Sequence, residues 1–131
     1  DWIEVRLKAG ARIMAERPSY TDKERAEGRK RAAEVIETRC RYYAPVMGVS
    51  YGTVTIREQK TRWGSCSSKG NLNFNCLLML ALAEILDYVV VHELCHRKEM
   101  NHSKAFWAEV EKVLPDYRES VKWLKEKGIV R

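Results

Sequence analysis

The three histidines of this 131-residue chain, His92, His96 and His102, all lie within eleven residues. The first two belong to the sequence H-E-L-C-H. Two histidines four positions apart lie about 40° apart around a helix and one turn apart along it, so both imidazoles can reach one cation. Glu93 follows the first histidine and can contact a water bound to that cation. With His102 as third ligand, three neutral imidazoles leave a tetrahedral zinc ion one open position, which a hydrolytic site needs.

The position of His102 requires the chain to reverse direction. In an unbroken helix, His102 would lie about 15 Å beyond His92 along the axis and could not share its metal. Asn101 tolerates the left-handed conformation that ends helices, and Ser103 can cap a new helix. The spacing therefore predicts that the chain turns back at about Asn101.

Several alternatives stay open at this point. Glu109 could replace His102 as the third ligand, and Glu99, Glu109 or Glu111 could orient a ligand histidine by a hydrogen bond. Cys95 could be the fourth ligand of a structural zinc, although it is more typical of a small packed residue. The alternative without a metal is a helix with one surface and one buried histidine. The apolar residues around the motif argue against this alternative, because they bury the helix, and buried His and Glu side chains need strong partners.

The composition indicates one domain with reduced thiols. The chain is long enough for its own core, and no run of 18 apolar residues exists, so we predict no membrane span. The four cysteines form no C-x-x-C pair, which favours free thiols in a cytoplasmic protein. The net charge is +6, yet residues 82–131 carry nine basic and nine acidic side chains. The excess is typical of a solvated surface, or it attracts nucleic acid or an acidic substrate.

Residues 1–48 are predicted to form two helices. Apolar residues at helical spacing predict the first from Trp2 to Ala15. Thr21 and Glu24 have the spacing of a capping box. They predict a second, long helix that continues to about Tyr43.

Residues 49–80 change to a pattern typical of strands. They predict a small antiparallel sheet of about three strands, with one packed face and one wet face. Residues 71–76 alternate strictly between asparagine and apolar residues. They are a candidate edge strand, which could pair with an extended peptide. Arg62, Trp63 and Asn73 are candidate substrate-binding residues, although such Trp and Arg side chains more often serve packing and surface charge.

Residues 82–131 are predicted to form three helices. The metal-binding helix begins at Leu82 or Ala83 and continues to about Met100. The next two cover Ser103 to Leu114 and Asp116 to Lys127. The whole chain, residues 1–131, is thus expected to form a single α+β domain.

Four motifs occur together in this chain. They are R-W-G-S-C at residues 62–66, N-L-N-F-N at 71–75, H-E-L-C-H at 92–96 and M-N-H-S at 100–103. In this combination the chain resembles the YgjP-like metallopeptidase domain family, whose members are described as predicted zinc-dependent hydrolases. The likeness covers about residues 50–110 closely. It implies a zincin-like fold, with a small sheet above the metal-binding helix.

The resemblance also implies a role for each residue of the motif. His92, His96 and His102 would bind one zinc ion, and Glu93 would be the catalytic base that takes a proton from the zinc-bound water. We therefore expect a zinc metallopeptidase that acts on polypeptides. The alternatives are a nucleic-acid-associated binding module with a zinc-stabilised core, or a protease recruited to DNA. The wider neighbourhood of the family includes DNA-associated proteases.

Overall fold

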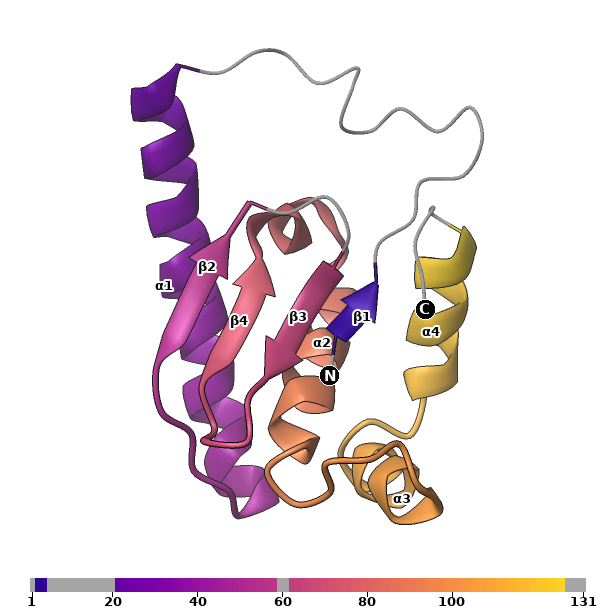
Figure 1. Ribbon diagram of the computed structural model, residues 1–131. Coiled ribbons are helices and arrows are strands. Elements are labelled where there is room, and N and C mark those ends of the chain that lie inside the picture. Colours follow the sequence, from indigo (N-terminus) through magenta and orange to yellow (C-terminus); the bar gives the residue numbers. More distant parts are fainter. Residues whose placement is uncertain (1, 5–20, 59–61, 127–131) are drawn as a thin grey trace.

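The computed structural model describes residues 2–4, 21–58 and 62–126 (Figure 1). Its helices and strands do not alternate regularly, which is the α+β arrangement that the sequence predicts. The elements in chain order are β1 (Trp2–Glu4), α1 (Asp22–Met47), β2 (Val54–Arg57), β3 (Arg62–Cys66), β4 (Leu72–Asn75), the 3-10 helix η1 (Cys76–Leu80), α2 (Ala83–Cys95), α3 (Lys104–Val113) and α4 (Tyr117–Glu126).

Helix α1 begins at the predicted capping box. The Thr21 hydroxyl accepts a hydrogen bond from the Glu24 N–H at 3.1 Å, and the Glu24 carboxylate accepts one from the Thr21 N–H at 2.9 Å. The helix continues past Tyr43 to Met47 and ends at Gly48, whose φ of 70° is left-handed. Glycine adopts this conformation without the steric cost that a Cβ would add.

The sheet differs from the prediction in its pairing. Its strand order is β1-β3-β4-β2, and β4 pairs parallel with β2 but antiparallel with β3. The sheet is therefore mixed, and β4 lies in its interior, so the prediction of residues 71–76 as an edge strand was wrong. The strict alternation of a strand predicts which face each side chain takes, but it says nothing about which strands become its neighbours.

The first predicted helix is also corrected where the structure describes it. Trp2–Glu4 form strand β1, which pairs antiparallel with β3. The rest of that predicted helix, residues 5–15, lies outside the described residues. Short apolar segments are compatible with either period, and pairing with β3 favours the extended conformation here.

Helices α1 and α2 cover one face of the sheet, behind it in Figure 1, and α3 and α4 lie beside α2. The core between these layers contains Ile36 of α1, Leu72 and Phe74 of β4, and Val89 and Val90 of α2, each at most 1% exposed. Burying side chains of this size stabilises the fold by about 1.5–3 kcal/mol each. The core thus fixes α2 directly beneath the strands.

A polar contact also holds the two long helices together. The Arg39 guanidinium donates to both oxygens of Asp87 at 2.7 Å, and the Tyr43 hydroxyl donates to the same carboxylate at 2.9 Å. This two-pronged geometry fixes the orientation of α2 relative to α1. No helix in the described part of the chain has both the length and the apolarity of a membrane span.

Candidate metal centre

Helix α2 ends earlier than its sequence predicts. It covers Ala83–Cys95, and His96 is its C-cap, so the predicted end at Met100 was wrong. The described residues include no non-glycine residue with a left-handed φ, so Asn101 does not reverse the chain in the predicted way. Instead the His96 ring Nδ1 donates to the Glu99 carbonyl oxygen at 3.0 Å. The chain turns around this side chain, and a carbonyl outside the helix gains a partner.

The predicted reversal nevertheless takes place and returns His102 to α2. Ser103 caps α3 (Lys104–Val113), because its hydroxyl accepts a hydrogen bond from the Phe106 N–H at 3.3 Å. The Phe106 ring then stacks on His96, with centroids 4.6 Å apart. The cap and the stacking together hold the first turn of α3 against the histidines.

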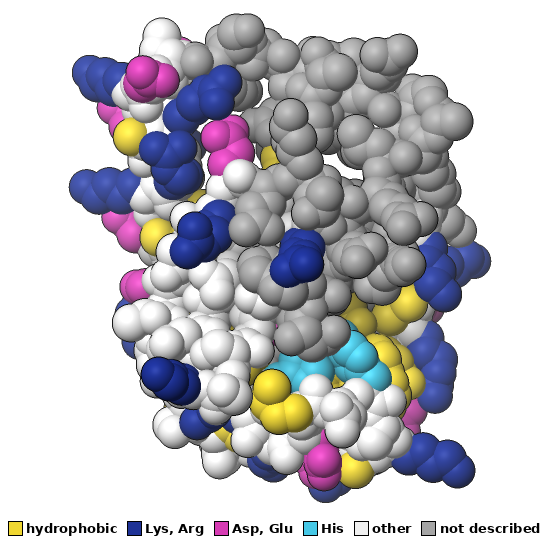
Figure 2. All heavy atoms as spheres, viewed as in Figure 1, with side chains coloured by type: hydrophobic (Ala, Val, Ile, Leu, Met, Phe, Trp, Pro, Cys, Tyr) yellow, Lys and Arg dark blue, Asp and Glu magenta, His cyan; other side chains and the backbone are white. Residues whose placement is uncertain are grey.

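The three histidines form one cluster in the folded chain. Their candidate ligand atoms all lie within 4.8 Å of one another, and the Nε2 atoms of His92 and His102 are 3.1 Å apart. Two nitrogens bound tetrahedrally to one zinc ion would lie about 3.3 Å apart. His92 and His96 are buried and His102 is exposed. Histidine side chains are visible on the face shown in Figure 2, where hydrophobic side chains border them.

The Nδ1 atoms of His92 and His96 contact groups outside the histidine cluster. The Glu99 carbonyl can only accept, so His96 carries its proton on Nδ1 and its Nε2 holds a lone pair. The Tyr88 hydroxyl lies 3.2 Å from the Nδ1 of His92. Burial lowers the pKa of His92, His96 and His102, which favours the neutral imidazole that binds metals.

Glu93 is the most isolated polar group of the site. Its side chain is fully buried, and neither carboxyl oxygen has a hydrogen-bond partner among the described residues. Burial raises the pKa of this carboxyl well above its usual range. A buried carboxyl without partners is costly. The cost is accounted for if a cation and its water occupy the space beside the histidines, so the donor set fits a bound metal.

Gly64 lets strand β3 approach this carboxylic acid closely. A Cβ at Gly64 would lie 3.2 Å from the Cγ of Glu93 and 3.1 Å from the Asn73 carbonyl oxygen. Either distance is tighter than an ordinary van der Waals contact, so a side chain here would require Glu93 or the neighbouring strand to shift by a few tenths of an ångström. In the sequence, Gly64 is the third residue of R-W-G-S-C, and the motif alone indicates no role for it. Tyr88 was missed as well, although it lies four residues before His92 and so faces the same way.

The other candidate ligands lie apart from the cluster. The Glu109 carboxylate accepts from Lys98 at 3.1 Å and from Lys112 at 3.2 Å. Glu109 does not belong to the cluster of side chains whose ligand atoms lie within 4.8 Å of one another. Cys95 is fully buried, and burial raises the pKa of its thiol to about 12, so it remains protonated as a small packed residue.

The candidate substrate-binding residues lie in the strands. Trp63 is only 7% exposed, and its indole N–H has no hydrogen-bond partner among the described residues. Asn73 accepts from Arg57 at 3.1 Å and donates to Ser65 at 3.3 Å. Arg62 is half-buried at the start of β3. The role of these three residues in substrate binding stays a prediction.

Comparison with protein families gives one assignment over most of the chain. The model of the YgjP-like metallopeptidase domain matches residues 13–127. No curated protein matches the chain.

Comparison with solved structures gives the same kind of protein. The crystal structure of the metallopeptidase zymogen abylysin of Pyrococcus abyssi is 28% identical, with a TM-score of 0.64, over 70% of this chain and 93% of that one. The metallopeptidase zymogen jannalysin of Methanocaldococcus jannaschii is 21% identical, with a TM-score of 0.62, over 70% and 95% of the two chains. The second likeness concerns the fold alone. The α+β arrangement is thus that of metallopeptidases.

Proposed function

The chain belongs to the YgjP-like metallopeptidase domain family, and from this premise we propose that it is a zinc-dependent peptidase. Membership and the structural likeness establish a metal-dependent peptidase. In the proposed site, His92, His96 and His102 hold one zinc ion and Glu93 is the general base. The observation that carries the proposal is the completely buried, unpartnered carboxyl of Glu93, next in sequence to a histidine of the cluster.

Zinc fits the donor set better than harder cations do. Magnesium and calcium prefer oxygen ligands, whereas neutral imidazole suits zinc. When bound, zinc would polarise the scissile carbonyl and lower the pKa of a water towards neutrality. The protein contributes the orientation of the rings: Tyr88 contacts the Nδ1 of His92, and the Glu99 carbonyl contacts the Nδ1 of His96.

Glu93 moves the protons in the proposed reaction. Its carboxylate takes a proton from the attacking water while the water oxygen bonds to the peptide carbonyl carbon. The same carboxyl then gives a proton to the leaving amine nitrogen as the C–N bond breaks. Burial raises the pKa of the Glu93 carboxyl, and a neighbouring cation favours the charged form that accepts a proton.

Metal removal tests the proposed function directly. We expect the purified chain to contain one zinc ion and to cleave an unfolded protein. A chelator should abolish cleavage, and added zinc should restore it. The measurements are metal analysis and product mass spectrometry, with and without single-stranded DNA. Tight, salt-sensitive DNA binding without cleavage of any unfolded protein would instead favour the nucleic-acid-binding module, which is the alternative function.

Replacing Tyr88 with Phe should weaken zinc binding without unfolding the chain. The change removes one hydroxyl, and with it the contact to the Nδ1 of His92 at 3.2 Å. Groups that orient a ligand histidine contribute about 10–100-fold to metal affinity. Competition with a chromogenic chelator measures this loss. Tyr43→Phe is the matched control, because its hydroxyl bonds to Asp87 and not to a histidine. Equal zinc affinity in both variants would exclude the assigned role of Tyr88.

A further inference from the structure

An open groove with basic side chains lies between α3 and α4. Its volume is about 480 Å³, and its lining residues come from both helices. They are Trp107, Tyr117, Arg118, Val121, Lys122 and Lys125. The lining thus combines an apolar floor with three cationic side chains and contains no carboxylate among these residues.

The floor of the groove is continuous with the histidine cluster. The Trp107 ring stacks on His102 with centroids 5.8 Å apart, and its centroid is also 5.8 Å from that of His92. Tyr117 stacks on Trp107 at 5.3 Å. On the face shown in Figure 2, hydrophobic side chains border the histidines, and Lys and Arg side chains stand beyond them over α4. A chain bound at the histidines can therefore extend into the groove.

Near α4 (Tyr117–Glu126), basic and acidic side chains line different grooves. Arg118, Lys122 and Lys125 follow helical spacing and share one face. Asp116 and Glu119 line a different groove, towards the start of α2. Arg118 does contact Glu111 at 3.1 Å, but the two side chains are 72% and 53% exposed, so this pair stabilises little.

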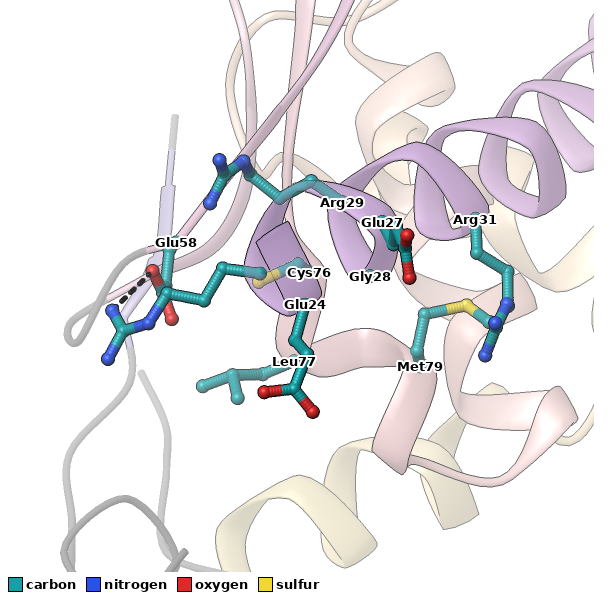
Figure 3. A pocket seen from close by; sticks show the side chains of 10 residues that line it. Glu24, Glu27, Gly28, Arg29, Arg31, Glu58, Cys76, Leu77 and Met79 are labelled. Carbon is teal, nitrogen blue, oxygen red and sulfur yellow. Dashed lines mark hydrogen bonds and ion pairs between the residues drawn. The ribbon is translucent and has the colours of Figure 1, made fainter. Parts of the chain in front are cut away.

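A second hollow differs from this groove because its lining carries equal numbers of acidic and basic side chains. It lies between the first turns of α1 and the 3-10 helix η1, and its lining combines three glutamates with three arginines (Figure 3). Within it, Arg25 contacts Glu58 at 3.4 Å. Such a surface has no preferred sign of ligand charge, whereas the groove beside the histidines attracts anions.

We propose that the α3–α4 groove binds acidic side chains of the polypeptide substrate, close to the cleaved bond. The proposal rests on the peptidase function proposed above and adds a substrate class to it. Trp107 in the floor of the groove lies 5.8 Å from His102 between ring centroids, and an extended chain advances about 3.3 Å per residue, so the groove begins about two residues from the scissile bond. Substrate carboxylates can pair with Arg118 and Lys125, and substrate methylenes can pack on Trp107 and Val121.

The same contacts disfavour a nucleic acid in this groove. Single-stranded DNA is held by bases that stack on bare aromatic faces. Tyr117 is only 8% exposed. Trp107 stacks on its ring, and the Arg118 guanidinium lies 4.8 Å from the ring centroid. An acidic peptide therefore fits the groove better than a base stack does.

Matched peptides test the proposal. Three fluorogenic peptides would share the residues around the cleaved bond. They would differ only at the second to fourth residues from that bond, where they carry glutamate, glutamine or lysine. One such set varies the residues before the bond, and another set varies the residues after it. For the zinc-loaded wild type at low salt, we expect kcat/KM for the glutamate peptide to exceed that for the glutamine peptide by about tenfold, which several exposed charge pairs can supply. The lysine peptide should be the poorest substrate.

Two variants locate the effect. In Arg118→Glu/Lys125→Glu, the ratio of kcat/KM between the glutamate and glutamine peptides should fall to one or below. The control Asp116→Lys/Glu119→Lys changes the charge of two residues that line the other groove, and it should keep the wild-type ratio. Fluorescence anisotropy of the glutamate peptide on the Glu93→Gln protein measures binding without turnover.

These readouts separate failure of the inference from failure of the proposed function. Cleavage of all three peptides at equal rates would overturn the acidic groove and leave the peptidase intact. If no peptide is cleaved, anisotropy decides, and binding of the glutamate peptide that Arg118→Glu/Lys125→Glu abolishes would still support the groove. Displacement of that peptide by single-stranded DNA of equal charge at lower concentration would overturn the proposal in favour of a nucleic-acid site.

Discussion

Replacing Glu93 with Gln should abolish peptide cleavage while the zinc stays bound. The amide has the size of the carboxyl but cannot accept the proton of the attacking water. General-base catalysis contributes about 10²–10⁴ to the rate, so we expect kcat to fall by at least about 100-fold. The side chain is fully buried without hydrogen-bond partners. A neutral amide there avoids the cost of a buried charge, so the fold should persist.

The measurement needs three readouts on the same preparation. Metal analysis should give one zinc per chain for both proteins, thermal unfolding should show an intact fold, and cleavage of an unfolded protein should be lost in Glu93→Gln alone. Glu84→Gln is the matched control, because Glu84 lies exposed in the first turn of the same helix. A Glu93→Gln protein with wild-type turnover would contradict the role of Glu93 as the general base.

Replacing His102 with Ala should lower zinc affinity by more than about 100-fold and remove activity. Groups outside the coordination sphere already contribute about 10–100-fold, so loss of a ligand should cost more. His102 is exposed, unlike His92 and His96. Its truncation therefore leaves no large cavity, and the effect on the metal can be read in a folded protein.

Glu109→Ala is the companion experiment for this prediction. Glu109 is the alternative third ligand, and in the structure it binds Lys98 and Lys112 instead. The zinc affinity of the Glu109→Ala protein should stay within about twofold of the wild type, because Glu109 lies outside the histidine cluster. Chelator competition and metal analysis compare the two variants. A Glu109→Ala protein without zinc, beside a zinc-bound His102→Ala protein, would reverse the assignment of the third ligand.

Local signals in the sequence predicted several elements correctly. The spacing of Thr21 and Glu24 predicted the start of α1, and Ser103 predicted the cap of α3; both caps are present. Helix caps involve residues within a few positions of one another, so their geometry follows from the helix itself. The spacing of His92 and His96 is of the same kind.

Other features depend on partners that are distant in the chain. The interior place of β4 follows from pairing with both β2 and β3. The early end of α2 is a local exception: the His96 side chain contacts the Glu99 carbonyl three residues further along the chain, which the tolerance of Asn101 for a left-handed turn did not predict. The role of Gly64 appears only when β3 lies on α2 beside Glu93.

The sequence by itself determined the metallopeptidase family and the group of residues offered for the metal, because H-E-L-C-H and the third histidine are set by local spacing. Only the tertiary structure decided what surrounds that group. Residues 82–131 have balanced charges in sequence, yet folding places Arg118, Lys122 and Lys125 beside Trp107, whereas Asp116 and Glu119 line another groove. Net charge adds over a segment, whereas the field that a substrate meets depends on which side chains share a surface.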